Sequence, residues 1–501
     1  MNLPKFAGAS LFFVFVSLFP TISPAAEQKK MNVLFIISDD LRAELNCYGD
    51  TPVQTPNLDR LATKGVRFER AYCQYPLCGP SRTSMLTGRH PTTTGVQGNR
   101  TWFGTEHPDW TSLPKYFRQN GYTTLRSGKI FHEGLDDTDA WDEGGEARYF
   151  GDAAPAAKKE KPAAATPSSA AEDEAHVKNM IAQDRSRASK SDRWEATPDD
   201  EAPPQADTVK TDKALELLRQ AKTSGKPFFL AFGLSKPHSP FIAPKRFFDL
   251  YKADEMPLPV DFAPRPTVPE GFPAGSIRPN NADLFIARDA SSKEAKEMIR
   301  GYLACISYMD WNAGRVLNEL EKLGLADRTI IVFWGDNGYQ LGEKGKWSKA
   351  GSLWEQGARI PLMIYDPRAK GNGKPSPRIV QSIDIYPTLV DLCGLPAVSG
   401  LDGLSLRPLL NGPQAKWDHP AYTIWNERAR GISGVVVRTE RWRYAEFYGR
   451  GAGAMLVDPL NDPHELKNLV NDPQHAATVK ELSALAKAYV GDQAEPTPKD
   501  N

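Results

Sequence analysis

The chain alternates short, continuously apolar segments with segments of helical periodicity. The apolar runs, rich in β-branched and aromatic residues, are residues 32–38, 122–127, 227–232, 329–334 and 361–365. The clearest helical segments between them are residues 212–223, 293–323 and 385–392. A strand that is apolar throughout has to be covered on both faces, and alternation with helices is typical of parallel strands joined by helical crossovers. The sequence therefore predicts an α/β fold with a large, mixed, mostly parallel sheet between helices.

Two regions depart from this alternation. Residues 151–206 are rich in Ala, Pro, Lys, Glu and Asp and almost lack large apolar side chains, which predicts a flexible surface insertion. Toward the C-terminus helices become rare. Short apolar runs at 421–425, 434–439, 442–447 and 455–458 predict a small antiparallel sheet there, followed by a helix over about residues 476–489. We therefore expect a catalytic domain over residues 27–415 and a C-terminal subdomain over residues 416–497.

The N-terminus has the pattern of an export signal. Lys5 precedes an apolar run over residues 11–19, and small residues follow at positions 23–26. This order is typical of a signal peptide, here residues 1–26, and the run is shorter than the roughly 20 residues that span a bilayer. We expect a secreted or periplasmic protein without a membrane span in the mature chain.

Composition excludes several classes of protein. Lys and Arg number 62, as do Asp and Glu, and no long basic stripe is present, which argues against a nucleic-acid partner. Five cysteines in 501 residues are too few for a disulfide scaffold, and none has the spacing of a zinc site.

Acidic side chains follow two of the predicted strands. Asp39 and Asp40 end the first, and Asp336 and Asn337 follow the run at 329–334. Ligands of open α/β sheets bind beyond the carboxyl ends of the strands, and an all-oxygen set suits Ca²⁺ or Mg²⁺. A single Asp at such a place is more often a helix cap or turn residue. Two clusters of like charge favour a cation between them.

Basic side chains follow other strands. Lys129 and His132 come after the run at 122–127, and His238 comes after the run at 227–232. Together with Arg82 and Lys349 they would surround a tetrahedral anion, and the histidines could transfer protons at neutral pH. Each alone is more often a surface or loop residue, so the hypothesis depends on the combination.

The most specific motif spans residues 76–88 and reads Pro-Leu-Cys-Gly-Pro-Ser-Arg-Thr-Ser-Met-Leu-Thr-Gly. Pro80 fits the first turn of a helix, which places Cys78 at the helix N-terminus, where the dipole and free amides stabilise negative charge. A buried structural cysteine is the general alternative.

This motif, Cys-x-Pro-x-Arg with the apolar pair and Thr-Gly, resembles the signature of the type I sulfatases of the alkaline-phosphatase-like superfamily. Within that family the iduronate 2-sulfatase branch is the most similar, on residues 32–42, 114–132, 236–241 and 335–349, and residues 458–471 resemble the family's C-terminal subdomain. That branch carries His where Asn337 stands here, so the substrate of that branch is not assigned unchanged to this chain.

The resemblance implies a site and a mechanism. Cys78 would be oxidised to formylglycine (3-oxoalanine) by a separate formylglycine-generating enzyme during export. The modified residue would bind one Ca²⁺ together with Asp39, Asp40, Asp336 and Asn337. Arg82 would favour ionisation of the attacking hydroxyl, Lys129 and Lys349 would offset charge on the sulfate, His238 would protonate the leaving alkoxide, and His132 would accept a proton from the second hydroxyl.

The resemblance also implies hydrolysis of a sulfated carbohydrate, such as a 2-O-sulfated uronic acid or related sugar of a glycosaminoglycan or algal polysaccharide. Two alternatives are a phosphoester or phosphonate hydrolase of the same superfamily and an inactive carbohydrate-binding homologue. Arg100 could bind a uronate or second sulfate. Sugar rings could stack on tryptophans that equally fit core packing, namely Trp102, Trp347, Trp354 and Trp425.

Overall fold

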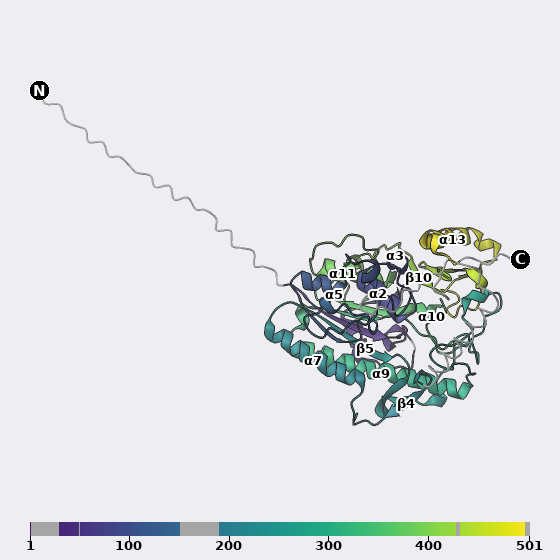
Figure 1. Ribbon diagram of the computed structural model, residues 1–501, viewed down its shortest axis with the longest axis horizontal. Coiled ribbons are helices and arrows are strands. Elements are labelled where there is room, and N and C mark those ends of the chain that lie inside the picture. The colour runs from purple at the N-terminus through teal and green to yellow at the C-terminus, as the bar shows by residue number, and fades with distance from the viewer. Residues whose placement is uncertain (2–29, 50, 151–189, 427–430, 496–501) are drawn as a thin grey trace. The chain divides into compact units, whose positions relative to one another are not determined.

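A seven-stranded mixed sheet forms the centre of the fold (Figure 1). The computed structural model describes Met1 and residues 30–49, 51–150, 190–426 and 431–495. The sheet order is β3 (Thr123–Gly128), β5 (Phe228–Pro237), β1 (Asn32–Asp39), β7 (Thr329–Gly335), β8 (Arg359–Tyr365), β2 (Val66–Tyr72) and β9 (Pro375–Gln381). The first four strands run parallel, β8 is antiparallel to both neighbours, and β2 is parallel to β9. The predicted mixed, mostly parallel sheet is confirmed, and all five predicted strands lie in it.

The central strand β1 shows why its sequence is apolar throughout. All eight of its residues are buried, with β5 on one side and β7 on the other. Leu34 and Ile36 belong to the core on one face of the sheet, whereas Val33, Phe35 and Ile37 belong to the core on the other. A strand with two buried faces has no position for an exposed polar side chain.

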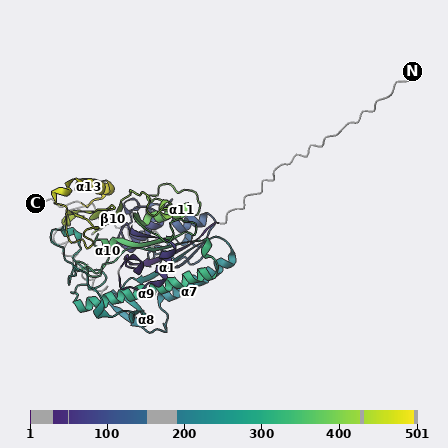
Figure 2. The ribbon, with the colours of Figure 1, turned by 180° about the vertical axis from the view of Figure 1, so that it is seen from behind.

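Helices cover both faces of the sheet (Figures 1 and 2). On one face lie α1 (Pro56–Lys64), α7 (Ala206–Ser224) and α9 (Ser292–Lys322), which share one apolar core with the strands. On the other lie α2 (Cys78–Thr87), α5 (Leu113–Gln119) and α11 (Ile385–Leu392). The three predicted helices correspond to α7, α9 and α11. Shorter helices are α3 (Pro91–Thr94), α4 (Phe103–Glu106), α8 (Lys245–Phe248), α10 (Glu355–Ala358) and α12 (Arg407–Asn411).

The expected flexible insertion, residues 151–206, is only partly described. Residues 151–189 lie outside the described part of the chain. Further on, β4 (Trp194–Thr197) pairs in parallel with β6 (Phe241–Pro244), and the Cβ of Trp194 lies against Gly301 of α9. The end of the segment therefore contains a strand that pairs with the rest of the fold.

The C-terminal sheet has four antiparallel strands, β10 (Ala421–Trp425), β11 (Gly434–Arg438), β12 (Arg443–Phe447) and β13 (Gly453–Val457). Helix α13 (Ala476–Val490) packs on it, so the predicted small antiparallel sheet and its helix are confirmed. Its apolar core also contains Leu353 and Trp354, and Met31–Asn501 form one compact unit.

The predicted signal peptide lies outside the described residues, apart from Met1. Within the described part of the chain, no helix is both long and apolar enough to cross a membrane.

Candidate active site

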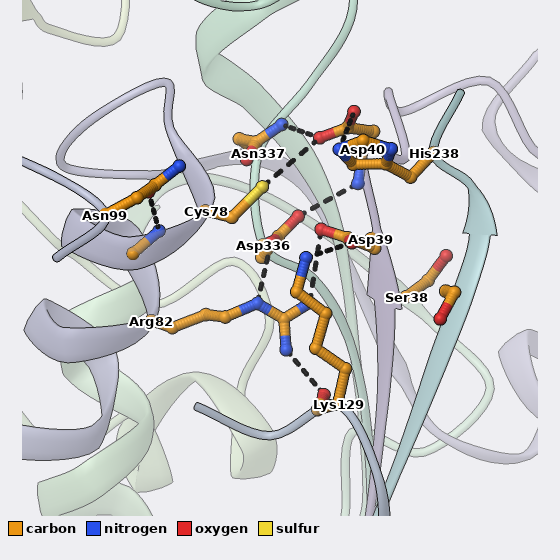
Figure 3. A network of polar contacts seen from close by, with 12 residues as sticks. Ser38, Asp39, Asp40, Cys78, Arg82, Asn99, Lys129, His238, Asp336 and Asn337 are labelled. Carbon is orange, nitrogen blue, oxygen red and sulfur yellow. Dashed lines mark hydrogen bonds and ion pairs between the residues drawn. The ribbon is translucent and has the colours of Figure 1, made fainter. Parts of the chain in front are cut away.

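Four neighbouring strands deliver side chains to one edge of the sheet (Figure 3). Strand β1 ends at Asp39 and is followed by Asp40, β7 is followed by Asp336 and Asn337, and β5 is followed by His238. Lys129 follows β3. Because parallel strands present their carboxyl ends together, side chains that are up to 298 positions apart in the sequence meet here.

The acidic residues form a compact, fully buried group. Carboxylate oxygens of Asp39, Asp40 and Asp336 lie within 4.8 Å of one another. Asp40 has a left-handed backbone (φ 64°), and its N–H donates to Asp336 Oδ1 at 3.0 Å. Asn337 Nδ2 donates to Asp40 Oδ1 at 2.9 Å, so the Asn337 amide oxygen is left buried with no hydrogen-bond partner among the described residues.

Charge crowding changes the acidity of these groups. Burial, and then the charge of Asp39, raise the pKa of Asp336 to about 7. Burial alone would raise the pKa of Asp39 too, but Lys129 and Arg82 hold it well below its usual range. Three carboxylates and an orphaned amide oxygen are hard ligands at spacings that suit Ca²⁺, so the residues present fit the ion that the sequence implies.

Arg82 connects the nucleophile helix to the acids. Its side chain has no exposed surface, and its Nε lies 2.8 Å from Asp336 Oδ2 and its Nη2 3.4 Å from Asp39 Oδ1. Nη1 donates to the carbonyl oxygens of Lys129, at 2.5 Å, and of Ile130, at 3.0 Å. A planar guanidinium can face these partners at once, whereas an ammonium group cannot, although Nη2 and Asp39 Oδ1 make no hydrogen bond with the described residues.

Cys78 begins helix α2, as the motif predicts, and its Sγ lies 3.7 Å from Asp40 Oδ1. Burial, followed by the charge of Asp39, raises the pKa of this thiol well above its usual value. The next residue, Gly79, donates its N–H to Asn99 Oδ1 at 2.8 Å. A Cβ at Gly79 would lie only 2.6 Å from that oxygen, so the helix start needs glycine.

The other bases lie around the acids. Lys129 forms an ion pair with Asp39, and Lys349 Nζ lies 2.6 Å from Asp40 Oδ2 and 3.3 Å from His238 Nε2. His238 Nδ1 lies 2.6 Å from the Ser239 carbonyl oxygen, which can only accept. The proton is therefore assigned to Nδ1, and Nε2 faces the site.

His132 lies at the border of the cluster. Burial, and then Lys129, lower the pKa of its ring to about 3, so it is neutral at physiological pH. Its Nδ1 is buried without a hydrogen-bond partner among the described residues. The structure thus brings together all ten predicted site residues, with His132 connected to the others by charge rather than by a hydrogen bond.

Two neighbours of the site had no signal in the sequence. Asp283 Oδ2 lies 3.8 Å from Lys349 Nζ, and Asn99 accepts the Gly79 N–H described above. Both lie in loops with no strand end or motif to mark them.

The tryptophans offered as sugar platforms are core residues. Trp102, Trp347, Trp354 and Trp425 are all buried, with exposed fractions of at most 6%. The packing alternative therefore holds for all four. Arg100, by contrast, is exposed, with its guanidinium over the Phe150 ring.

Comparison with known proteins agrees with this geometry. The sulfatase family model matches residues 31–395, and the model of the N-sulphoglucosamine sulphohydrolase C-terminal region matches residues 342–489. The chain is 33% identical to a sulfatase of Formosa agariphila, over 92% of this chain and 87% of the relative. It is also 33% identical to mouse iduronate 2-sulfatase, over 90% of this chain and 93% of the relative.

The fold is shared with solved structures. One, determined in complex with D-glucosamine-2-N,6-O-disulfate, superposes with a TM-score of 0.68 at 23% identity and covers 92% of this chain and 97% of its own. Fold and site together define a hydrolase of the alkaline-phosphatase-like class. The chain belongs to the sulfatase family, and the protein is a sulfuric ester hydrolase.

Proposed function

We propose that the protein hydrolyses sulfate esters of a sulfated carbohydrate, with Ca²⁺ as its metal and with Cys78 converted to formylglycine. The position of Cys78 is the observation that carries this proposal. It lies at the first turn of α2, beside the acids and within the field of Lys129 and Lys349, and burial raises the pKa of its thiol. As a hydrated aldehyde, residue 78 supplies one hydroxyl to attack sulfur and a second whose deprotonation releases sulfate.

The chain's own residues then have separate tasks. Asp39, Asp40, Asp336 and Asn337 would hold Ca²⁺, which offsets the carboxylate charge and polarises a sulfate oxygen when bound. Arg82 fixes the acids against the backbone of residues 129–130, and the two lysines bind sulfate oxygens.

The two histidines move protons. As an imidazolium, with a proton on each ring nitrogen, His238 is placed to give its Nε2 proton to the leaving oxygen and to become neutral, while Nδ1–H stays bonded to the Ser239 carbonyl oxygen. His132, held neutral by burial, is the acceptor for the proton of the second hydroxyl.

The substrate class follows from the relatives. Mouse iduronate 2-sulfatase, by its name, acts on a sulfated uronic acid, and another relative, 27% identical, is called an ulvan-active sulfatase. We therefore propose a 2-O-sulfated uronic acid or related sugar of a glycosaminoglycan or algal polysaccharide. We also propose that residues 1–26 direct the protein to the periplasm or the exterior, and that a formylglycine-generating enzyme modifies Cys78 during export.

The test compares substrates and cysteines. Protein produced together with a formylglycine-generating enzyme should hydrolyse an aryl sulfate and a 2-O-sulfated uronate disaccharide faster than an aryl phosphate. Cys78→Ala should abolish turnover, whereas Cys305→Ala, which removes another buried thiol, should leave it unchanged. Mass spectrometry of the peptide with residue 78 should show the aldehyde. Faster phosphate turnover would favour the phosphohydrolase alternative, and an unmodified, inactive protein would favour the binding homologue.

A further inference from the structure

An open pocket of about 580 Å³ lies between the main sheet and the C-terminal sheet. Arginines of several elements line it, namely Arg70 of β2, Arg359 of β8, Arg438 of β11 and Arg441 between β11 and β12. None of its described lining residues belongs to the catalytic cluster, so the pocket has no assigned role.

Two of these arginines, Arg70 and Arg359, interact electrostatically with nearby glutamates but form no ion pair with a described carboxylate. Arg438 lies 3.7 Å from Glu355, and Arg441 lies 3.1 Å from Asp458. Within the described residues, Arg70 and Arg359 have no carboxylate within ion-pair distance. Burial, and then the neighbouring Arg438, lower the pKa of Arg70, as expected where like charges crowd together.

The acids that line the pocket already have basic partners. Glu69 pairs with Arg67 at 3.2 Å, Glu440 pairs with Arg378 at 2.5 Å, and Glu355 pairs with Arg443 at 3.0 Å. Asp458 and Glu465 pair with Arg441 and Arg443, so the seven arginines of the pocket and its ion pairs face five acids, and the pocket keeps a positive surplus.

Arg359 also has unused hydrogen-bonding capacity. Its Nε donates to the Glu69 carbonyl oxygen at 2.8 Å, and among the described residues neither Nη group has a hydrogen-bond acceptor. Arg70 lines the same pocket and is fixed there, since its Nε and Nη2 donate to the Pro377 carbonyl oxygen and its Nη1 donates to that of Glu440 at 2.6 Å. A half-buried guanidinium with a free fork is suited to two oxygens of a sulfo or carboxylate group.

The remaining wall is apolar. It includes Pro377, Pro459, Pro463 and Leu460, whose side chain is 66% exposed. A bare inorganic anion gains nothing from such a wall, whereas the C–H face of a sugar ring can pack against it. The two kinds of lining together favour an anionic saccharide.

We propose that this pocket is an accessory binding site for a sulfated saccharide, in which Arg359 and Arg70 hold a sulfo or carboxylate group and the sugar ring lies on the apolar wall. The choice of saccharide rests on the proposed function. The charge surplus and the free guanidinium fork rest on the structure alone.

The test counts binding sites on the full-length protein. In Cys78→Ala protein, which cannot turn over its ligand, calorimetric titration with a sulfated uronate disaccharide should give two sites per chain. Arg359→Gln should reduce the stoichiometry to one, or weaken the second site about tenfold through loss of a charge-assisted contact. Arg265→Gln is the matched control, because Arg265 is exposed and already paired with Asp289. A single site that Arg359→Gln leaves unchanged, or a second site unaffected by Arg359→Gln, would overturn the proposal, whereas a single site that Arg359→Gln removes would be the pocket itself.

Further arms separate the remaining explanations. Arg70→Gln provides an independent variant if thermal unfolding shows that Arg359→Gln is misfolded. Inorganic sulfate that binds the second site as tightly as the disaccharide does, with the same dependence on Arg359, would overturn the saccharide assignment. Aryl sulfate turnover by Arg359→Gln protein with Cys78 intact should equal that of the parent. Absence of turnover in the parent would refute the proposed function and leave the pocket's stoichiometry as a separate result.

Discussion

Replacing Arg82 by Met should destabilise the protein and abolish its activity. Arg82 is fully buried between Asp336 and Asp39, and it also satisfies two backbone carbonyl groups. Removing one member of a buried ion pair leaves an uncompensated charge and costs about 3–5 kcal/mol of unfolding free energy. With an unfolding entropy of about 2.1 cal/mol/K per residue over the unit Met31–Asn501, this corresponds to a fall in Tm of about 3–5 °C.

Arg118→Met is the matched control. Arg118 makes the same kinds of contact, with the Asp142 carboxylate at 2.9 Å and the Asp139 carbonyl oxygen at 2.6 Å, but its side chain is 42% exposed. An exposed pair contributes about 0–1 kcal/mol, so Tm should change by no more than about 1 °C and activity should be kept.

The assay is thermal unfolding with a chelator present, so that only protein groups offset the acids. At pH 5 Asp336, with its pKa raised to about 7, carries a proton in the folded protein. Arg82→Met should therefore lower Tm by less at pH 5 than at pH 8, and the effect of Arg118→Met on Tm should be the same at both pH values. Equal Tm shifts for the two variants, or a shift for Arg82→Met that does not depend on pH, would refute the reasoning.

Three further predictions concern the metal, the proton donor and pH. Ca²⁺ at 100 times its Kd should raise the unfolding free energy by about 2.7 kcal/mol, as measured by thermal unfolding. Asn337→Leu removes the amide oxygen that has no hydrogen-bond partner, so this variant should lose most of the rise. An equal rise in the variant would contradict the assignment of Asn337 as a ligand. His238→Gln should lower kcat for an alkyl sulfate by about 10²–10⁴ but should affect 4-nitrophenyl sulfate much less, because nitrophenolate leaves without a proton; equal losses would exclude His238 as the acid. The raised pKa of Asp336 stabilises the folded state at low pH. With a chelator present, this contribution to the unfolding free energy should disappear as the pH rises from about 4 through 7. Asp336→Asn should lack this pH-dependent contribution, and an unfolding profile equal to that of the parent would contradict the prediction.

Much of the fold could be predicted because buried parallel strands have a distinct sequence pattern. The two strands of the central sheet that were missed, β2 and β9, lack it. Strand β2 carries Arg67, Glu69 and Arg70, and β9 is an edge strand with prolines at positions 375 and 377. Edge strands tolerate proline because one side of their backbone needs no partner. The order of the strands was not predictable either, since it depends on which way each crossover connection runs.

More of the candidate site than of the strand order could be predicted from the sequence. Residues that follow parallel strands meet at one edge whatever the order, and the Cys78 motif marked the helix that faces them. Asp283 and Asn99 could not be found in this way, because loop packing alone brings them to Lys349 and Gly79. The tryptophans failed as predicted sugar platforms for the opposite reason: residue type alone does not distinguish a binding face from the core.

The charges of the site explain how the proposed Ca²⁺ and two lysines would act together. Asp39, Asp40, Asp336 and Asp283 carry four negative charges when ionised, and Arg82, Lys129 and Lys349 carry three positive ones, so these seven groups sum to −1. A group with this charge does not attract an anionic ester. With the proposed Ca²⁺ the sum is +1, and the lysines that otherwise serve as counterions of Asp39 and Asp40 can attract the sulfate. The proposed ion therefore determines substrate affinity as well as reactivity, and a chain with equal numbers of acids and bases can still present a positive site.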